Sequence, residues 1–202
     1  MKFRREEYLE IMTFGNPSRP MFVELFGPLI GLEDEWKAQG ATQDEIDMVA
    51  FDWDYLPVVW AGGNTGIRGG QEKQILEDSE EYRVEIDELG RRIKLPKKSA
   101  TIALPLEFPV KDMDSWLKVK PLFEFHEDRI DWQAVQQAKQ AQENGALVVG
   151  SILGGYDIPR ELMGDAYACV CYYEQPELMQ DILDTLTDTA MQTYERISEK
   201  LV

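Results

Sequence analysis

Two aspartates, Asp52 and Asp54, stand one residue apart in the short segment FDWD (51–54). In an extended backbone, side chains two positions apart point to the same side, so both carboxylates would face one region. A carboxylate pair of this kind can share a proton or hold a cationic ring. The alternative is that the two aspartates only supply polarity to a helix end and a turn.

Three arginines lie in expected loops beside expected strands: Arg19, Arg68 and Arg160. A guanidinium binds a carboxylate through two parallel hydrogen bonds, so each arginine is a candidate for holding the carboxylate of a substrate. The chain carries 38 acidic and 21 basic residues. In so acidic a protein, an arginine can equally be the partner in a structural ion pair.

The stretch 145–168 is expected to position two further candidates, Tyr156 and Arg160. Residues 146–153 form a short apolar run with β-branched side chains, which is typical of a strand buried in a parallel sheet. A bend with two glycines, Gly154 and Gly155, follows, and Pro159 fits the first turn of a helix. Enzymes of the α/β class bind ligands in such loops, where Tyr156 could donate a hydrogen bond. The alternative is a structural corner in which Tyr156 packs its ring.

Together these patterns predict a site at one rim, formed by Asp54, Trp60, Tyr156 and Arg160. Arg160 would bind a carboxylate, the two aromatic side chains would face a planar group, and Asp54 would take part in proton transfer. Trp60 belongs to a second expected strand at 58–61. Asp54 precedes that strand, so spacing alone would place this aspartate at the opposite rim.

Several helices and four parallel strands are expected to carry these residues. Residues 84–95 alternate around Glu88-Leu89-Gly90-Arg91, which predicts an antiparallel hairpin outside the parallel sheet. Apolar residues recur at helical spacing after Pro176, which predicts a long final helix. The other expected helices cover 3–14 and 32–39 and begin after Thr42, Asp112 and Asp131, and the expected strands are 21–26, 58–61, 101–104 and 146–153.

Composition limits the classes of partner. The net charge of −17 argues against nucleic acid or an anionic membrane surface as a partner. The sequence has no apolar run of the ~20 residues that a membrane span needs, and the N-terminus does not resemble a secretory signal. One histidine and two cysteines without zinc spacing predict no metal site in this chain. We therefore expect a cytoplasmic protein with a single domain, 1–202.

The order of several motifs resembles the uroporphyrinogen decarboxylase family, especially its divergent branch near the corrinoid-dependent methyltransferases. The resemblance runs from about Arg19 to the final helix. The motifs that carry it are FDWD (51–54) before Leu-Pro-Val, PLEFPVKD (105–112), DR (128–129) with Trp132 just after, RELMG (160–164) and QPEL (175–178).

This resemblance implies a (β/α)8 barrel, which takes about 250 residues. The chain of 202 residues, with four expected parallel strands, would then be the N-terminal half of such a barrel with an inserted β-hairpin. The family's zinc-binding histidine and cysteine residues would lie beyond this half. Half a barrel has two open sheet edges, so a second copy or a partner chain is expected to cover them.

The resemblance also implies roles for the candidate residues. Asp54 best matches the family's catalytic aspartate, with Asp52 second, and Arg19 is the one arginine kept from a motif that grips substrate carboxylates. Arg160 stands where the decarboxylases have a tyrosine. The implied activity is methyl transfer or decarboxylation on a small or tetrapyrrole-like carboxylated ligand. Any corrinoid or tetrapyrrole would be a substrate or a group borne by a partner protein, and no cofactor is expected in this chain. The alternative is a truncated or split member that has no activity of its own and assembles with another chain.

Overall fold

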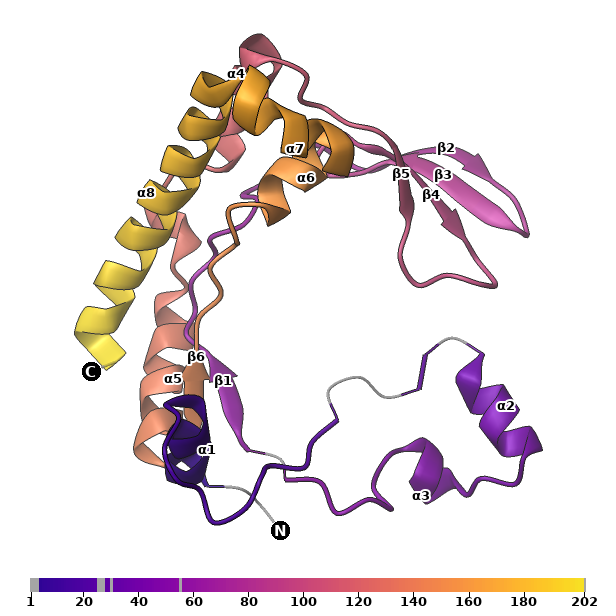
Figure 1. Ribbon diagram of the computed structural model, residues 1–202, viewed down its shortest axis with the longest axis vertical. Coiled ribbons are helices and arrows are strands. Elements are labelled where there is room, and N and C mark those ends of the chain that lie inside the picture. Colours follow the sequence, from indigo (N-terminus) through magenta and orange to yellow (C-terminus); the bar gives the residue numbers. More distant parts are fainter. Residues whose placement is uncertain (1–3, 25–27, 30, 55, 202) are drawn as a thin grey trace.

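The computed structural model describes residues 4–24, 28–29, 31–54 and 56–201 (Figure 1). Within these residues the fold is a mixture of helices and two small sheets. The α-helices are α1 (Arg5–Met12), α2 (Leu32–Ala38), α3 (Gln43–Ile46), α4 (Met113–Val119), α5 (Trp132–Glu143), α6 (Asp157–Met163), α7 (Asp165–Glu174) and α8 (Pro176–Leu201), and two 3-10 helices are η1 (Lys120–Leu122) and η2 (Glu127–Arg129).

The strands form two separate sheets. One is a parallel pair of β1 (Val58–Trp60) and β6 (Leu147–Val149), with Val58 opposite Leu147 and Trp60 opposite Val149. The other is antiparallel, in the order β2-β3-β4-β5. Its strands are β2 (Gln74–Asp78), β3 (Tyr82–Ile86), β4 (Arg92–Pro96) and β5 (Leu104–Glu107).

The prediction of half a (β/α)8 barrel is wrong, because the described residues contain only two parallel strands. Two of the four expected strands are missing from that sheet. Residues 21–24 form no strand, and the rest of the expected strand at 21–26 lies outside the described residues. Of the expected strand 101–104, only Leu104 is in a strand, and β5 pairs antiparallel with β4. Short apolar runs do not reveal their partners, so this segment joined the other sheet.

The predicted hairpin is confirmed as β3 and β4, with Glu85 opposite Ile93. Gly90 has φ of 86°, which a residue with a side chain rarely adopts. The carboxylate of Asp87 accepts the backbone N–H groups of Leu89 (3.0 Å) and Arg91 (2.8 Å). The backbone N–H groups of the turn are therefore bonded within the turn itself. A turn of this kind can be specified by the local sequence alone.

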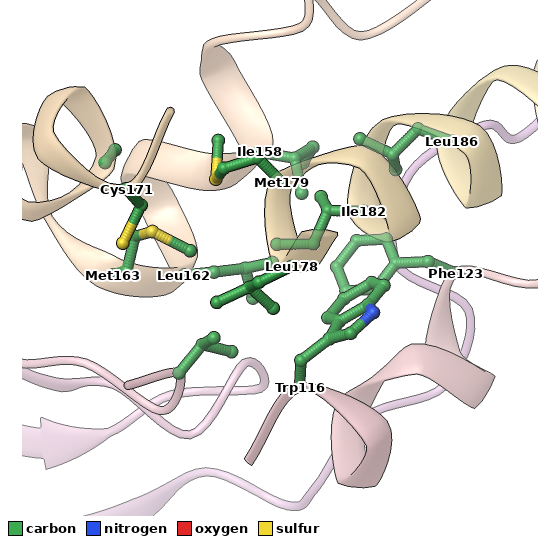
Figure 2. Close-up of a cluster of buried hydrophobic side chains, with 12 residues drawn as sticks. Trp116, Phe123, Ile158, Leu162, Met163, Cys171, Leu178, Met179, Ile182 and Leu186 are labelled. Atoms are coloured by element: carbon green, nitrogen blue, oxygen red, sulfur yellow. The ribbon is translucent and has the colours of Figure 1, made fainter. Parts of the chain in front are cut away.

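The long helix α8 connects two hydrophobic clusters. Its first half supplies Leu178, Met179, Ile182 and Leu186 to a cluster with side chains from α4, η1, α6 and α7 (Figure 2). Its second half supplies Ile197 to a smaller cluster against α5 and the parallel pair. The predicted apolar stripe of this helix is confirmed.

Three buried threonines also lie along α8, which the apolar pattern did not predict: Thr185, Thr189 and Thr193. The hydroxyl of Thr189 donates to the carbonyl of Phe123 at 2.7 Å, and the other two donate to carbonyls of their own helix. Because each hydroxyl has a partner, the hydrogen bonds offset the cost of removing these polar groups from water.

One buried arginine, Arg129 of η2, joins three chain segments. Its side chain is 2% exposed, and its guanidinium donates to four backbone carbonyls. The acceptors are Leu122 (2.7 Å), Gly66 (2.8 Å), Glu124 (2.8 Å) and Asn64 (3.0 Å). Burial lowers the pKa of Arg129 from its ordinary value. No carboxylate is among these acceptors, so Arg129 acts as a cross-link between loops.

No helix within the described ranges is both long enough and apolar enough to cross a membrane.

Candidate functional site

Asp54 is locked in an ion pair with Arg19. The two guanidinium nitrogens lie 2.5 Å and 2.6 Å from the two carboxylate oxygens, and Oδ2 also accepts the backbone N–H of Phe22 at 2.9 Å. The Asp54 side chain is 3% exposed, whereas that of Arg19 is 43% exposed. These contacts, the Arg19 hydrogen bonds foremost, lower the pKa of Asp54 to about 2. At neutral pH this carboxylate is ionised and fully engaged, so it anchors the chain before β1.

Acid should break this anchor at an unusually low pH. Because the folded pKa is about 2 and the ordinary value is 3.8, the pair stabilises the fold above about pH 3.8 and loses that effect as pH falls through 2. Following the Asp54 carboxyl carbon by NMR should give a midpoint near 2. In Arg19→Ala the midpoint should move up towards 3.8, and a wild-type midpoint near 4 would contradict the pairing.

Asp52, the other member of the predicted pair, is exposed, whereas Asp54 is buried. The negative charge of Asp52 helps to raise the pKa of Arg19, after the larger effect of Asp54. The predicted carboxylate pair therefore divides into one buried anchor and one surface residue.

Tyr156 is the residue just before α6, and Arg160 lies in the last turn of this short helix. The Tyr156 hydroxyl donates to Asp165 Oδ1 at 3.0 Å and lies 3.8 Å from the Cys169 sulfur. These contacts, that with Cys169 first, raise the pKa of Tyr156 to about 12. The phenol therefore keeps its proton at neutral pH and can act as a hydrogen-bond donor. Neither Gly154 nor Gly155 has the positive φ that the sequence allowed, but a Cβ at Gly155 would lie 3.4 Å from Leu183.

A cleft of about 430 Å³ opens beside Arg160, between the antiparallel sheet and helices α6 and α7. One wall is apolar and comes from β4, β5 and the loop before β5. The other wall carries charged side chains. The lining residues are Arg91, Ile93, Ile102, Ala103, Leu104, Pro105, Phe108, Arg160, Glu161 and Asp165.

Most charges in this cleft already have partners. Arg91 donates to Asp87 at 2.7 Å and forms an ion pair with Glu161, and Asp165 accepts from Tyr156. Arg160 lies 3.4 Å from Glu161 and 3.5 Å from Asp157, and among the described residues its guanidinium forms no hydrogen bond. It is 40% exposed. Arg160 is therefore the cation in the cleft with donors to spare.

The remaining predicted site residues lie elsewhere. Arg68 binds Asp128 through two contacts of 2.6 Å and 2.8 Å, which is the structural ion pair that the sequence left open. Trp60 lies on β1 and is 65% exposed. Asp54 precedes β1, whereas Tyr156 and Arg160 follow β6. Because the two strands are parallel, Asp54 precedes one end of the pair, whereas Tyr156 and Arg160 follow the other end. A ligand site that these three residues share with Trp60 stays a prediction.

The apolar wall of the cleft was not predicted from sequence patterns. Phe108 lies against Gly164, whose φ is 83° and where a Cβ would come within 2.7 Å of the Phe108 ring. The hairpin was expected to lie outside the parallel sheet and residues 101–104 were expected to be one of its strands, and no residue of either segment was a candidate for the site. The glycine at position 164 was the only local signal of this close contact.

No group of three or more histidine, cysteine, aspartate or glutamate side chains within the described residues is placed to hold a metal ion. Comparison of the chain with protein-family models, with curated proteins and with solved structures finds no match.

Proposed function

We propose that this chain binds a small carboxylated ligand with a planar or apolar body in the cleft beside Arg160. The observation that carries the proposal is the half-exposed guanidinium of Arg160, which forms no hydrogen bond within the described chain and faces an apolar wall. A carboxylate would complete its donors through a bidentate contact, and burying an apolar body against Leu104 and Phe108 would add affinity.

The sequence resemblance supports the same ligand class. A relation to uroporphyrinogen decarboxylases or corrinoid methyltransferases would make the ligand a tetrapyrrole-like or small carboxylate. In that function Arg160 would hold the carboxylate, and Tyr156 would hold Asp165 in place at the edge of the cleft by donating its hydroxyl proton to it. Asp54 would serve only as the anchor of the chain before β1, because its carboxylate is fully engaged by Arg19 and Phe22.

Arg160→Ala is expected to weaken binding of a carboxylated ligand about 10- to 100-fold, the range that corresponds to one hydrogen-bonded charge. Suitable probes are 3-phenylpropionate and coproporphyrin, titrated by calorimetry. Their methyl esters keep the apolar body and lose the charge, so they should bind wild-type protein as weakly as the acids bind the variant.

Arg196→Ala is the matched control, because Arg196 is also a part-exposed arginine, paired with Glu127 and outside the cleft. It should bind the acids like wild type. The proposal fails if acid and ester bind equally well, or if Arg160→Ala and Arg196→Ala have the same effect.

A further inference from the structure

Within the part of the chain that the structure describes, the parallel pair β1–β6 is covered on one face only. Side chains alternate along a strand, so Val59 and Ala61 share one face, and Val58 and Trp60 share the other. Ala61 and, from β6, Val148 belong to the cluster formed with α5 and α8. On the opposite face Val58 is 51% exposed and Trp60 is 65% exposed. Parallel sheets are normally buried on both faces, so this open face lacks a layer.

Among the described residues, the outer edge of β1 also has no paired strand. Two hydrogen bonds flank the pairing with β6: the N–H of Leu147 donates to the carbonyl of Pro57, and the N–H of Ala61 donates to the carbonyl of Val149. In a parallel ladder, alternate residues bond to the same neighbour, so the backbone groups of Val58 and Trp60 point away from β6. No hydrogen bond in the described part of the chain uses them. A free edge beside an exposed apolar face is a template for one more strand.

The segment that leads into β1 is strongly acidic. We call residues 31–54 the acidic arm; it contains α2 and α3, which extend away from β1 in Figure 1. Helix α2 buries none of its residues. The arm has one basic residue, Lys37, against eight acidic residues: Glu33, Asp34, Glu35, Asp44, Glu45, Asp47, Asp52 and Asp54.

Aromatic rings add apolar surface where the arm meets β1. Trp53 stacks on Phe22 with ring centroids 4.5 Å apart and contacts Phe51 at 5.5 Å. Phe22 is nevertheless 57% exposed and Phe51 is 42% exposed. A chain that lies along β1 would therefore meet apolar side chains and negative charge together.

We propose that a second, positively charged polypeptide docks here and adds a strand parallel to the outer edge of β1. Its apolar side chains cover Val58 and Trp60, and its basic side chains face the acidic arm. Charge selects this occupant over a second copy of the chain, because two molecules of charge −17 repel each other. The proposal does not depend on the ligand cleft.

A synthetic peptide can represent the partner. A labelled nine-residue peptide with alternating valine and threonine between pairs of lysines should bind the wild-type protein, measured by fluorescence anisotropy. Hydrogen exchange should show new protection at the amides of Val58 and Trp60. Two control peptides, one with a central proline and one with glutamates in place of the lysines, should bind at least 10-fold more weakly.

Trp60→Glu and Val58→Glu should each reduce binding of the lysine peptide at least 10-fold, and Trp132→Glu, at a tryptophan 40% exposed on α5, should not. Circular dichroism would check that the variants keep their folds. Equal binding of all three peptides, or no binding, would overturn the proposal. So would a dimer of the chain alone, seen by light scattering and dissolved by Trp60→Glu, because the occupant would then be a second copy.

Discussion

Replacing Arg129 by alanine is expected to lower the free energy of unfolding by about 4 kcal/mol, a large part of the stability of a typical domain. The guanidinium is 2% exposed and is bound by the carbonyls of Asn64, Gly66, Leu122 and Glu124. Without it, these carbonyls would lose their partner in a region closed to water, and each unsatisfied group costs about 1–3 kcal/mol. Urea unfolding measures the loss as a lower midpoint.

Arg129→Lys separates charge from geometry. An ammonium keeps the positive charge but cannot reach four carbonyls in the arrangement that the planar guanidinium holds, so most of the loss should remain. Arg68→Ala is the matched control, because that arginine is bound to Asp128 at the surface and should leave the urea midpoint nearly unchanged. A midpoint for Arg129→Ala close to that of Arg68→Ala would show that Arg129 is not the cross-link described above.

The second large effect is expected at Trp116. This side chain is fully buried in the cluster shown in Figure 2, with its ring 5.9 Å from that of Phe123. Its indole N–H donates to Asp181 Oδ2 of α8 at 2.6 Å. Trp116→Ala should cost about 4 kcal/mol, because it leaves a cavity and removes a hydrogen bond to a charged group. Thermal or urea unfolding would detect this loss.

Trp116→Phe should cost less, about 2 kcal/mol, since it refills most of the volume and loses mainly the hydrogen bond. The pKa of Asp181 is held below its ordinary value first by Lys120 and then by this N–H, so the same variant should raise it. Trp132→Ala, at a partly exposed tryptophan, is the size-matched control and should change stability little. Equal losses for Trp116→Ala and Trp132→Ala would contradict the packing seen here.

Elements with local causes could be predicted from the sequence. The hydroxyl of Thr42 accepts the N–H of Glu45 and the Glu45 carboxylate accepts the N–H of Thr42, and Asp131 accepts two amides at the start of α5. The turn around Gly90 and the long apolar stripe of α8 belong to the same class. Each depends on residues within a few positions of one another, so the spacing along the chain already contains the contact.

Strand partners and site walls were decided only by the tertiary structure. β1 pairs with β6, which lies far from it in the sequence, while β5 joined the antiparallel sheet, and a short apolar run favours neither arrangement. In the same way, Arg19 and Arg160 were both candidates for binding a substrate carboxylate, yet Arg19 is bound to Asp54 by two hydrogen bonds, whereas Arg160 lies 3.4 Å from Glu161 and 3.5 Å from Asp157. The sequence determined which side chains can ionise, which can cap a helix and which are apolar enough to be buried. Which of them meet depends on contacts between distant segments, because the entropy of closing long loops is offset only by the whole packed arrangement.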